Sequence, residues 1–222
     1  VPVIIETKAE NKFRLTAEEL EEKITDKTKL LVLPYPNNPT GAVMRREDLE
    51  AVARVVERHN LLVLSDEIYA SLTYGSEPHT AFSAIPGMQE RTILVNGFSK
   101  SHAMTGWRMG FSLWPKAWGD AARKLAVNSY SCVNASAQWA GLAALTGPQD
   151  EVYAMVAEFD RRRQIVVEGL NRLPGVSSVT PKGAFYAFPN IRKTGWKAKP
   201  LASALLEQAG VATIGGPDFG VH

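Results

Sequence analysis

A lysine and an arginine lie eight residues apart in the most informative stretch of this sequence, residues 96–110. Lys100 follows an apolar, strand-like segment at residues 92–95, and Arg108 follows a Thr-Gly-Trp turn. A lysine at the end of a buried strand is poorly hydrated, so its ammonium form is disfavoured and its amine can act as a nucleophile. Such an amine forms a Schiff base with an aldehyde, and pyridoxal phosphate is the common biological aldehyde that needs one. Taken alone, the stretch favours a surface loop that carries an ordinary lysine and arginine.

Polar residues also follow two apolar segments further upstream. The motif Pro-Asn-Asn-Pro-Thr-Gly at residues 36–41 comes after the apolar residues 30–33, and such a cluster is typical of a loop. In an open α/β sheet, ligands bind at the carboxyl ends of the strands, where Asn38 would offer an amide donor. A plain turn without a ligand is the alternative.

The second upstream motif, Ser-Asp-Glu-Ile-Tyr at residues 65–69, follows the apolar residues 61–64. A carboxylate at the end of a buried strand is costly unless it has a partner, and a protonated pyridine nitrogen would be such a partner for Asp66. Capping of the next helix is the alternative role. Arg108 would bind the phosphate of the same ligand in a bidentate manner, with a surface salt bridge as its alternative.

Together these motifs resemble a known family of enzymes. Asn38, Asp66, Tyr69, Lys100 and Arg108, in this order, resemble the fold-type I pyridoxal-phosphate enzymes, and more closely the bacterial aspartate aminotransferase-like group of the class I/II aminotransferases. The motifs that carry the resemblance are Asn-Pro-Thr-Gly, Ser-Asp-Glu-Ile-Tyr and Ser-Lys-x-x-x-Met-x-Gly-Trp-Arg-x-Gly. The resemblance covers essentially the whole chain, and family members are longer at both ends. It therefore implies that the chain is an interior fragment.

The resemblance also implies a role for each of the five residues. Lys100 would form the Schiff base with pyridoxal 5'-phosphate and then move the proton between the substrate α-carbon and the cofactor. Asp66 would pair with the pyridine nitrogen, and Tyr69 and Asn38 would hydrogen-bond the phenolic oxygen of the cofactor. Arg108 would bind the phosphate. On this reading Lys100, Asp66 and Tyr69 are catalytic, and all five residues bind the cofactor.

Three further expectations come from the family pattern. Many relatives carry a serine three residues before the lysine, and its replacement by Gly97 predicts weaker phosphate binding. A cis peptide bond is expected between Asn38 and Pro39. Phe185 and Tyr186 either approach the substrate or are plain core aromatics, and the sequence does not choose between these two readings.

The resemblance implies that the full-length parent transfers an amino group between an amino acid and a 2-oxo acid, with aspartate and 2-oxoglutarate as the expected pair. A homodimer with sites at its interface is also expected. The arginine that holds the substrate carboxylate would lie beyond His222, so the fragment itself is expected to be inactive. Two alternatives stay open: a pyridoxal-phosphate lyase or synthase that uses the same five residues, and a catalytically incompetent or non-catalytic ligand-binding domain.

Composition limits the possible partners. The 222 residues are 45% hydrophobic and 22% charged, with a formal net charge of +2 and no basic run, which disfavours nucleic acid. We expect no membrane association, because no apolar stretch reaches membrane-spanning length. The single cysteine, Cys132, excludes an internal disulfide and favours a cytoplasmic location. The four histidines show no metal-ligand spacing, so no metal is expected.

Alternating apolar segments predict an α/β fold with three layers and a mostly parallel sheet. Strands are expected at residues 3–7, 29–34, 61–66, 92–95 and 108–114. The last of these should run antiparallel, because the preceding turn is too short for a crossover. Helices are expected from Thr16, where Glu19 completes a capping box, and at residues 46–59, 118–130 and 135–145. Residues 1–150 would form a large cofactor-binding domain that is incomplete at its amino terminus.

Residues 151–222 are expected to form a linking helix and part of a small α+β domain, incomplete at its carboxyl terminus. The helix would span residues 150–173, where apolar side chains recur at helical spacing. Beyond it, strands are expected at residues 176–180, 184–188 and 211–214, and a helix at residues 201–208.

Overall fold

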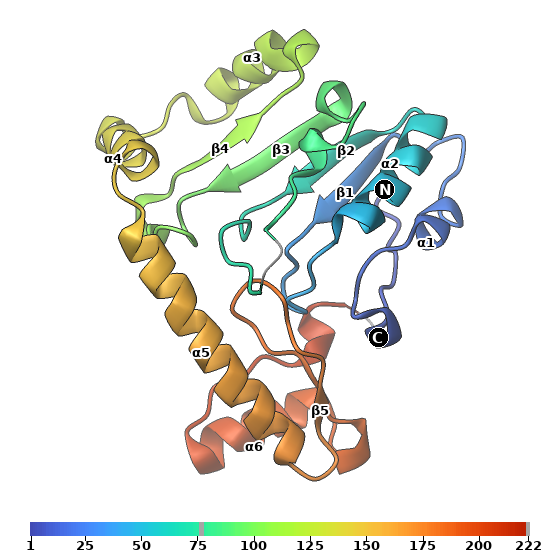
Figure 1. The fold of residues 1–222 in the computed structure, drawn as a ribbon, viewed down its shortest axis with the longest axis vertical. Coiled ribbons are helices and arrows are strands. Elements are labelled where there is room, and N and C mark those ends of the chain that lie inside the picture. Colours follow the sequence, from blue (N-terminus) through green and yellow to red (C-terminus); the bar gives the residue numbers. More distant parts are fainter. Residues whose placement is uncertain (76–77, 221–222) are drawn as a thin grey trace.

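The computed structural model describes residues 1–75 and 78–220, which are built around a four-stranded sheet in the order β1-β2-β3-β4 (Figure 1). Strands β1 (Leu30–Pro34), β2 (Leu62–Asp66) and β3 (Thr92–Gly97) are parallel, and β4 (Gly110–Leu113) is antiparallel to β3. The predicted α/β class, with a mostly parallel sheet and one antiparallel strand at this position, is confirmed.

The register of the three parallel strands brings their carboxyl ends together. Pro34 pairs with Asp66, and Asp66 pairs with Val95. The loops that follow β1, β2 and β3 therefore leave the sheet from the same edge. These loops carry the polar motifs of the sequence, so their side chains meet by the geometry of the sheet alone.

One face of the sheet is covered by two helices. Helix α1 (Ala17–Glu21) begins at the predicted capping box, in which the backbone N–H of Glu19 donates to the Thr16 hydroxyl and the N–H of Thr16 donates to the Glu19 carboxylate. Helix α2 (Arg46–Arg58) packs its apolar side on β1 and β2, and the buried core consists of Leu31, Leu33, Leu49, Val52, Val56, Val63, Phe82 and their neighbours.

This packing makes a testable prediction about β1. Leu33→Ala is expected to lower the free energy of unfolding by about 2–5 kcal/mol, because it deletes buried methyl groups and leaves a cavity. Leu30→Ala in the same strand is the matched control, since Leu33 is 2% exposed and Leu30 is 44% exposed. Urea unfolding of both variants measures the difference. Equal losses of stability would contradict the assignment of the covered face.

After β4 the chain is helical. Helix α3 (Gly119–Tyr130) and helix α4 (Ala135–Thr146) lie on the β4 side of the sheet, away from α1 and α2 (Figure 1). The long helix α5 (Asp150–Arg172) then leads away from the sheet to a second group of elements. None of the helices in residues 1–75 and 78–220 is long and apolar enough to cross a membrane.

The second group contains a two-stranded antiparallel sheet and one helix. Strand β5 (Ser177–Ser178) pairs with β6 (Pro189–Asn190), and helix α6 (Ala198–Ala209) follows. Short 3-10 turns complete the described chain at Ala9–Asn11, Phe82–Ala84, Gln89–Arg91, Thr105–Trp107, Lys116–Trp118, Arg192–Thr194 and Gly216–Asp218.

Three predicted strands are wrong. Residues 3–7 and 211–214 have the apolar pattern of strands, but within the described chain they pair with no other strand, and a strand needs a partner for its backbone groups. Residues 184–188 form a loop, because Ala184 has a φ of 56° and its N–H donates to the carbonyl of Leu72 instead of a β ladder.

Candidate functional site

Tyr69 is the residue around which the predicted site residues gather. It is buried in the loop after β2, and the Nζ atom of Lys100 lies 5.8 Å from the centre of its ring. Its hydroxyl interacts with the Asn38 amide and with the negative charge of Asp66. The structure thus brings four of the five predicted residues together at the carboxyl edge of the sheet.

Lys100 lies in the turn that follows β3. Two backbone hydrogen bonds close this turn, from His102 N to Phe98 O (3.2 Å) and from Ala103 N to Lys100 O (3.4 Å). The half-buried lysine points its Nζ atom at two aromatic rings, and its distance to the centre of the Phe185 ring is 5.6 Å. Among the described residues, no carboxylate forms an ion pair with it. Aromatic faces attract a cation but do not hold it as a carboxylate would, so the amine remains accessible for chemistry.

Asp66 is the last residue of β2, and Asn38 lies in the loop after β1. One carboxylate oxygen of Asp66, Oδ1, accepts the N–H of Ile68 at 3.2 Å, and the described residues donate no hydrogen bond to Oδ2. A half-buried carboxylate with a free oxygen at a strand end can accept a further hydrogen bond from a ligand. Asn38 is exposed, and the predicted cis peptide bond between Asn38 and Pro39 is present.

The environment of Tyr69 raises the pKa of its hydroxyl. Burial is the largest cause, followed by the hydrogen bond with the Tyr186 hydroxyl at 2.6 Å and by the negative charge of Asp66. The Asn38 amide lowers the pKa but does not outweigh these effects. Tyr69 therefore keeps its proton well above neutral pH and can donate a hydrogen bond to an oxygen placed beside it.

Phe185 and Tyr186 reach this site from a distant part of the sequence. The segment that carries them is attached to the sheet loops by backbone hydrogen bonds, in which Lys182 N and Gly183 N donate to Gly41 O, each at 2.9 Å. A Cβ on Gly41 would lie 2.3 Å from the Cβ of Pro181, so this close approach requires glycine.

The attachment continues on the neighbouring loop. Ala184 N donates to Leu72 O at 2.8 Å, Tyr74 N donates to Lys182 O at 2.9 Å, and the Tyr74 hydroxyl donates to Ala184 O. As a result, the Phe185 ring packs edge-on against Tyr69, with 5.4 Å between ring centres. Both aromatic residues lie at the site, which favours the first of the two readings that the sequence left open.

The contact between the two tyrosines makes a prediction. Tyr186→Phe is expected to lower the pKa of Tyr69, because it removes the second-largest cause of the upward shift. The pKa should stay above the ordinary value of about 10, since burial still raises it. Tyrosine ring resonances followed by NMR in an alkaline titration measure the change. Tyr153→Phe, on the exposed side of α5, is the control and should leave Tyr69 unchanged.

Arg108 is the predicted residue that the structure does not join to the others. Arg108 lies just before β4 and has a left-handed φ of 51°. Its side chain is exposed, and its guanidinium donates to Thr105 O at 3.0 Å. Within the described residues, no hydrogen bond or ion pair joins its side chain to the other four. The turn itself is tied to the lysine turn, because the Thr105 hydroxyl donates to Ser99 O at 3.0 Å.

Gly97 has a structural explanation in the pairing of β3 with β4. It lies opposite Gly110, and a Cβ on Gly97 would lie 3.0 Å from the Gly110 Cα and 3.2 Å from Met109 O. A serine here would force these neighbours to move by a few tenths of an ångström. The close approach of the two strands therefore favours glycine at this position.

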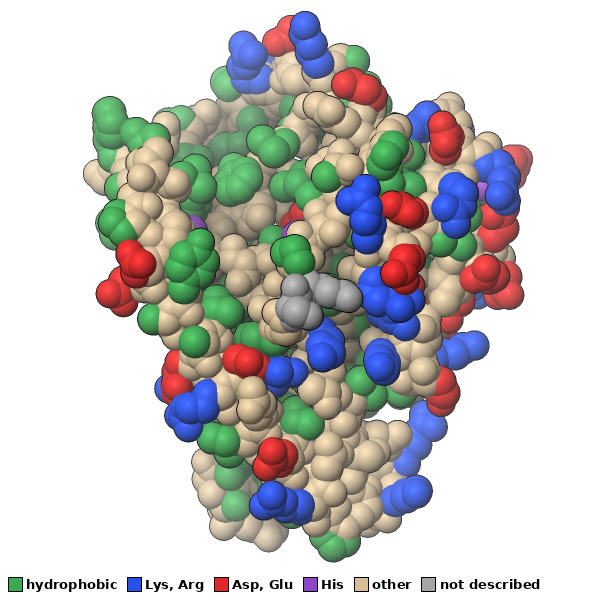
Figure 2. Space-filling view, in the orientation of Figure 1, with side chains coloured by type: hydrophobic (Ala, Val, Ile, Leu, Met, Phe, Trp, Pro, Cys, Tyr) green, Lys and Arg blue, Asp and Glu red, His purple; other side chains and the backbone are tan. Residues whose placement is uncertain are grey.

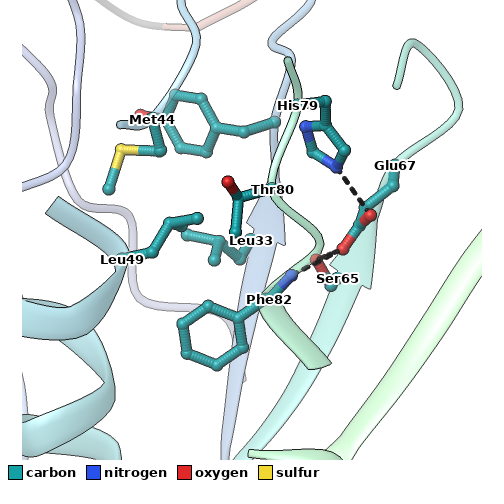
Figure 3. A pocket seen from close by; sticks show the side chains of 9 residues that line it. Leu33, Met44, Leu49, Ser65, Glu67, His79, Thr80 and Phe82 are labelled. Atoms are coloured by element: carbon teal, nitrogen blue, oxygen red, sulfur yellow. Dashed lines mark hydrogen bonds and ion pairs between the residues drawn. The ribbon is translucent and has the colours of Figure 1, made fainter. Parts of the chain in front are cut away.

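Two further polar residues, Glu67 and His79, lie beside this site, and no sequence motif indicated a role for them. Glu67 is 2% exposed, and its carboxylate is hydrogen-bonded to the ring of His79, with both residues lining the same small cavity (Figure 3). Glu67 belongs to the Ser-Asp-Glu-Ile-Tyr motif. The sequence feature that could have indicated a role for Glu67 is an acidic residue shortly after an apolar strand. Such an acid needs buried donors, but the sequence alone does not identify them. No group of three or more His, Cys, Asp or Glu residues that could hold a metal ion occurs among the described residues.

Comparison with known proteins finds relatives over nearly the whole of this chain. The family model for aminotransferase class I and II matches residues 1–222. An aspartate aminotransferase of Geobacillus stearothermophilus is 41% identical and an aromatic-amino-acid aminotransferase of Thermococcus litoralis is 40% identical, each over 99% of this chain. The crystal structure of an aromatic aminotransferase from Pyrococcus horikoshii superimposes with a TM-score of 0.95 at 42% identity, over 99% of this chain and 59% of that one. The chain spans 58% and 57% of the lengths of the two relatives.

Proposed function

The chain belongs to the class I and II aminotransferases, which use pyridoxal phosphate, and we propose that the protein in which it occurs moves an amino group between an amino acid and a 2-oxo acid. The observation that carries this proposal is the placement of the Lys100 amine over the Tyr69 ring, beside Asp66 and Asn38. These residues offer an amine, a phenol, a carboxylate and an amide at one edge of the sheet.

The chemistry of these groups fits the cofactor. An aldehyde needs an amine, which Lys100 supplies, and a pyridine nitrogen needs an acid partner, which Asp66 supplies at the end of β2. Tyr69 keeps its proton, so it can donate a hydrogen bond to the phenolic oxygen. When bound, pyridoxal phosphate supplies an acceptor for the electrons that remain after a substrate proton is removed.

Lys100 is proposed to have two roles. Its amine holds the cofactor before the substrate binds and afterwards carries the proton that leaves the substrate α-carbon. A general base must lie within reach of that proton and have a pKa near the working pH. The Nζ atom of Lys100 faces the Tyr69 and Phe185 rings, and among the described residues no carboxylate forms an ion pair with it, so no other charged group competes for the amine.

Arg108 is proposed to bind the cofactor phosphate. Its guanidinium is exposed, and among the described residues it donates a hydrogen bond to the carbonyl of Thr105. The planar guanidinium can turn toward a phosphate at the lysine turn and bind two of its oxygens. Asn38, Asp66, Tyr69, Lys100 and Arg108 together form the proposed cofactor site.

Aspartate with 2-oxoglutarate is the proposed substrate pair. Support comes from the Ala-Met-Thr-Gly-Trp-Arg motif at residues 103–108, which resembles the aspartate branch, and from the aspartate aminotransferase among the relatives. The aromatic-amino-acid aminotransferase is nearly as similar, at 40% identity against 41%, so an assay has to offer aspartate and phenylalanine side by side. Oxaloacetate formed faster than phenylpyruvate is the expected result.

A homodimer is proposed for the complete protein. Figure 2 shows hydrophobic side chains gathered around a hollow near α3 and α4. The exposed apolar residues of this region include Leu113, Trp114, Leu125, Trp139 and Leu142. A surface of this kind favours burial against another chain or segment. Light scattering after size-exclusion chromatography of the protein from its complete reading frame tests the proposal, and an active monomer would contradict it.

The covalent link between lysine and cofactor gives the most direct test of the function. The protein expressed from its complete reading frame is mixed with pyridoxal phosphate, reduced with borohydride and digested. The masses of the peptides are then measured by mass spectrometry. We expect one modified peptide, with the cofactor mass on Lys100. A cofactor attached to other lysines, or to none, would refute the proposed function.

A further inference from the structure

Glu67 is a buried acid that the proposed reaction does not use. Its carboxylate accepts three hydrogen bonds, from the Ser65 hydroxyl at 2.8 Å, from Phe82 N at 3.0 Å and from the His79 ring at 2.7 Å (Figure 3). The first two donors reach Oε1, and the ring nitrogen Nε2 of His79 reaches Oε2. A carboxylate accepts but does not donate, and these three donors give each of its two buried oxygens a partner.

The backbone of Glu67 is held as well. Its N–H donates to Val95 O of β3 at 2.8 Å, and its carbonyl accepts Ala70 N at 2.9 Å. Glu67 therefore joins the end of β2, the neighbouring strand β3 and the segment that contains His79 and Phe82. A residue that is fixed at its side chain and at both backbone groups has little freedom to shift.

Strand alternation then connects Glu67 to the site. Successive side chains of a strand point to opposite faces, so Ser65 and Glu67 share the covered face, and Asp66 between them points to the other. The Ser65 and Glu67 side chains are bonded to each other at 2.8 Å, which fixes the backbone on both sides of Asp66. Tyr69 follows in the same short loop and interacts with Asp66.

We propose that Glu67 is a positioning residue, whose carboxylate fixes Asp66 and Tyr69 in their productive orientation by joining Ser65, Phe82 and His79. The proposal rests on the proposed function, because Asp66 and Tyr69 are its cofactor-facing residues. Reacting groups need to be held within about 0.5 Å of their productive geometry. A shift of about 1 Å can lower the rate of an enzyme by about 100-fold.

Two substitutions at Glu67 distinguish the effect of its hydrogen bonds on the position of Asp66 and Tyr69 from the effect of its negative charge. Glu67→Ala removes all three hydrogen bonds. Glu67→Gln can keep them, because the amide oxygen can accept from Ser65 and Phe82 while the amide N–H can donate to the Nε2 atom of His79 in the ring tautomer that leaves this nitrogen as an acceptor. Leu49→Ala is the matched control, since Leu49 lines the same cavity from α2 without bonding to the strand end.

The test measures turnover and backbone exchange in the protein from its complete reading frame. We expect Glu67→Ala to lower kcat by about 10- to 100-fold with KM changed by less than about threefold, and Glu67→Gln and Leu49→Ala to keep kcat within about threefold. In the cofactor-free protein, hydrogen–deuterium exchange should rise at residues 66–70 and 82 in Glu67→Ala, but not in Glu67→Gln.

Three outcomes would overturn the inference. Equal losses of kcat in Glu67→Ala and Glu67→Gln would show that turnover depends on the negative charge of Glu67 and not on the position that its hydrogen bonds give to Asp66 and Tyr69. Equal losses in Glu67→Ala and Leu49→Ala would show a general loss of stability. Unchanged turnover in Glu67→Ala, beside an active unmutated protein, would overturn this inference alone, whereas an inactive unmutated protein would overturn the proposed function with it. If Glu67→Ala does not fold, Ser65→Ala is measured in its place, and its expected loss of kcat is smaller.

Discussion

Lys100→Ala is expected to lower the rate of transamination by about 10,000-fold or more and to abolish covalent attachment of the cofactor. The loss is large because one amine performs two tasks, as the nucleophile that holds the aldehyde and as the base that moves the substrate proton. General acid–base catalysis alone contributes about 100- to 10,000-fold. Steady-state rates and the mass of the reduced, digested protein measure both effects.

A second lysine variant provides the control for this experiment. Lys23→Ala removes an exposed lysine close to α1 and should change neither turnover nor the mass of the Lys100 peptide. If Lys100→Ala retained turnover and carried the cofactor on another lysine, the assignment of Lys100 as the nucleophile would be contradicted. Because Lys100 is half-buried beside Tyr69 and Phe185, circular dichroism has to show that the variant is folded.

Asp66→Ala is expected to lower kcat by about 100- to 1,000-fold, while the affinity for pyridoxal phosphate falls much less. The carboxylate is proposed to keep the pyridine nitrogen protonated, which stabilises the negative charge that develops during the reaction. Removal of one group aimed at developing charge typically costs a factor of this size. Binding of the cofactor depends on Lys100 and Arg108 as well, so the loss of Asp66 leaves most of it in place.

The measurement compares kcat with the dissociation constant for the cofactor in the same variant. Asp26→Ala, in an exposed turn before β1, is the matched control and should change neither quantity. If cofactor affinity fell as much as kcat, the carboxylate would be a binding residue and would not act in the chemistry. The loss of the Asp66 charge should also lower the pKa of Tyr69, because that charge raises it.

Tyr69 shows how much of the site the sequence predicted. Its place after an apolar strand and the motif around it indicated a site residue, and the structure places it beside Asn38, Asp66 and Lys100. The partner of its hydroxyl, Tyr186, lies 117 positions away. The order of residues along the chain carries no information on that contact, and the sequence accordingly left two readings for Tyr186.

The strands predicted wrongly have a common physical cause. An apolar alternating pattern describes one segment, whereas a strand exists only beside a partner. Residues 184–188 show this, because Ala184 is fully buried but its backbone bonds to the loop at Leu72. The division of the chain near residue 150 into a large and a small domain remains a prediction.

The identities and order of the reactive groups were determined by the sequence alone, and so was the α/β arrangement that places them. Apolar runs, helix caps and turn residues act over a few neighbouring positions, and three parallel strands of matched register must end at one edge of the sheet. Tertiary structure alone decided the surroundings of these groups. The Tyr69–Tyr186 contact, the burial of Glu67 among its donors and the close approach of Gly97 to Gly110 join segments that are separate in the chain. Such contacts arise when folded surfaces pack against one another, and no local pattern encodes them.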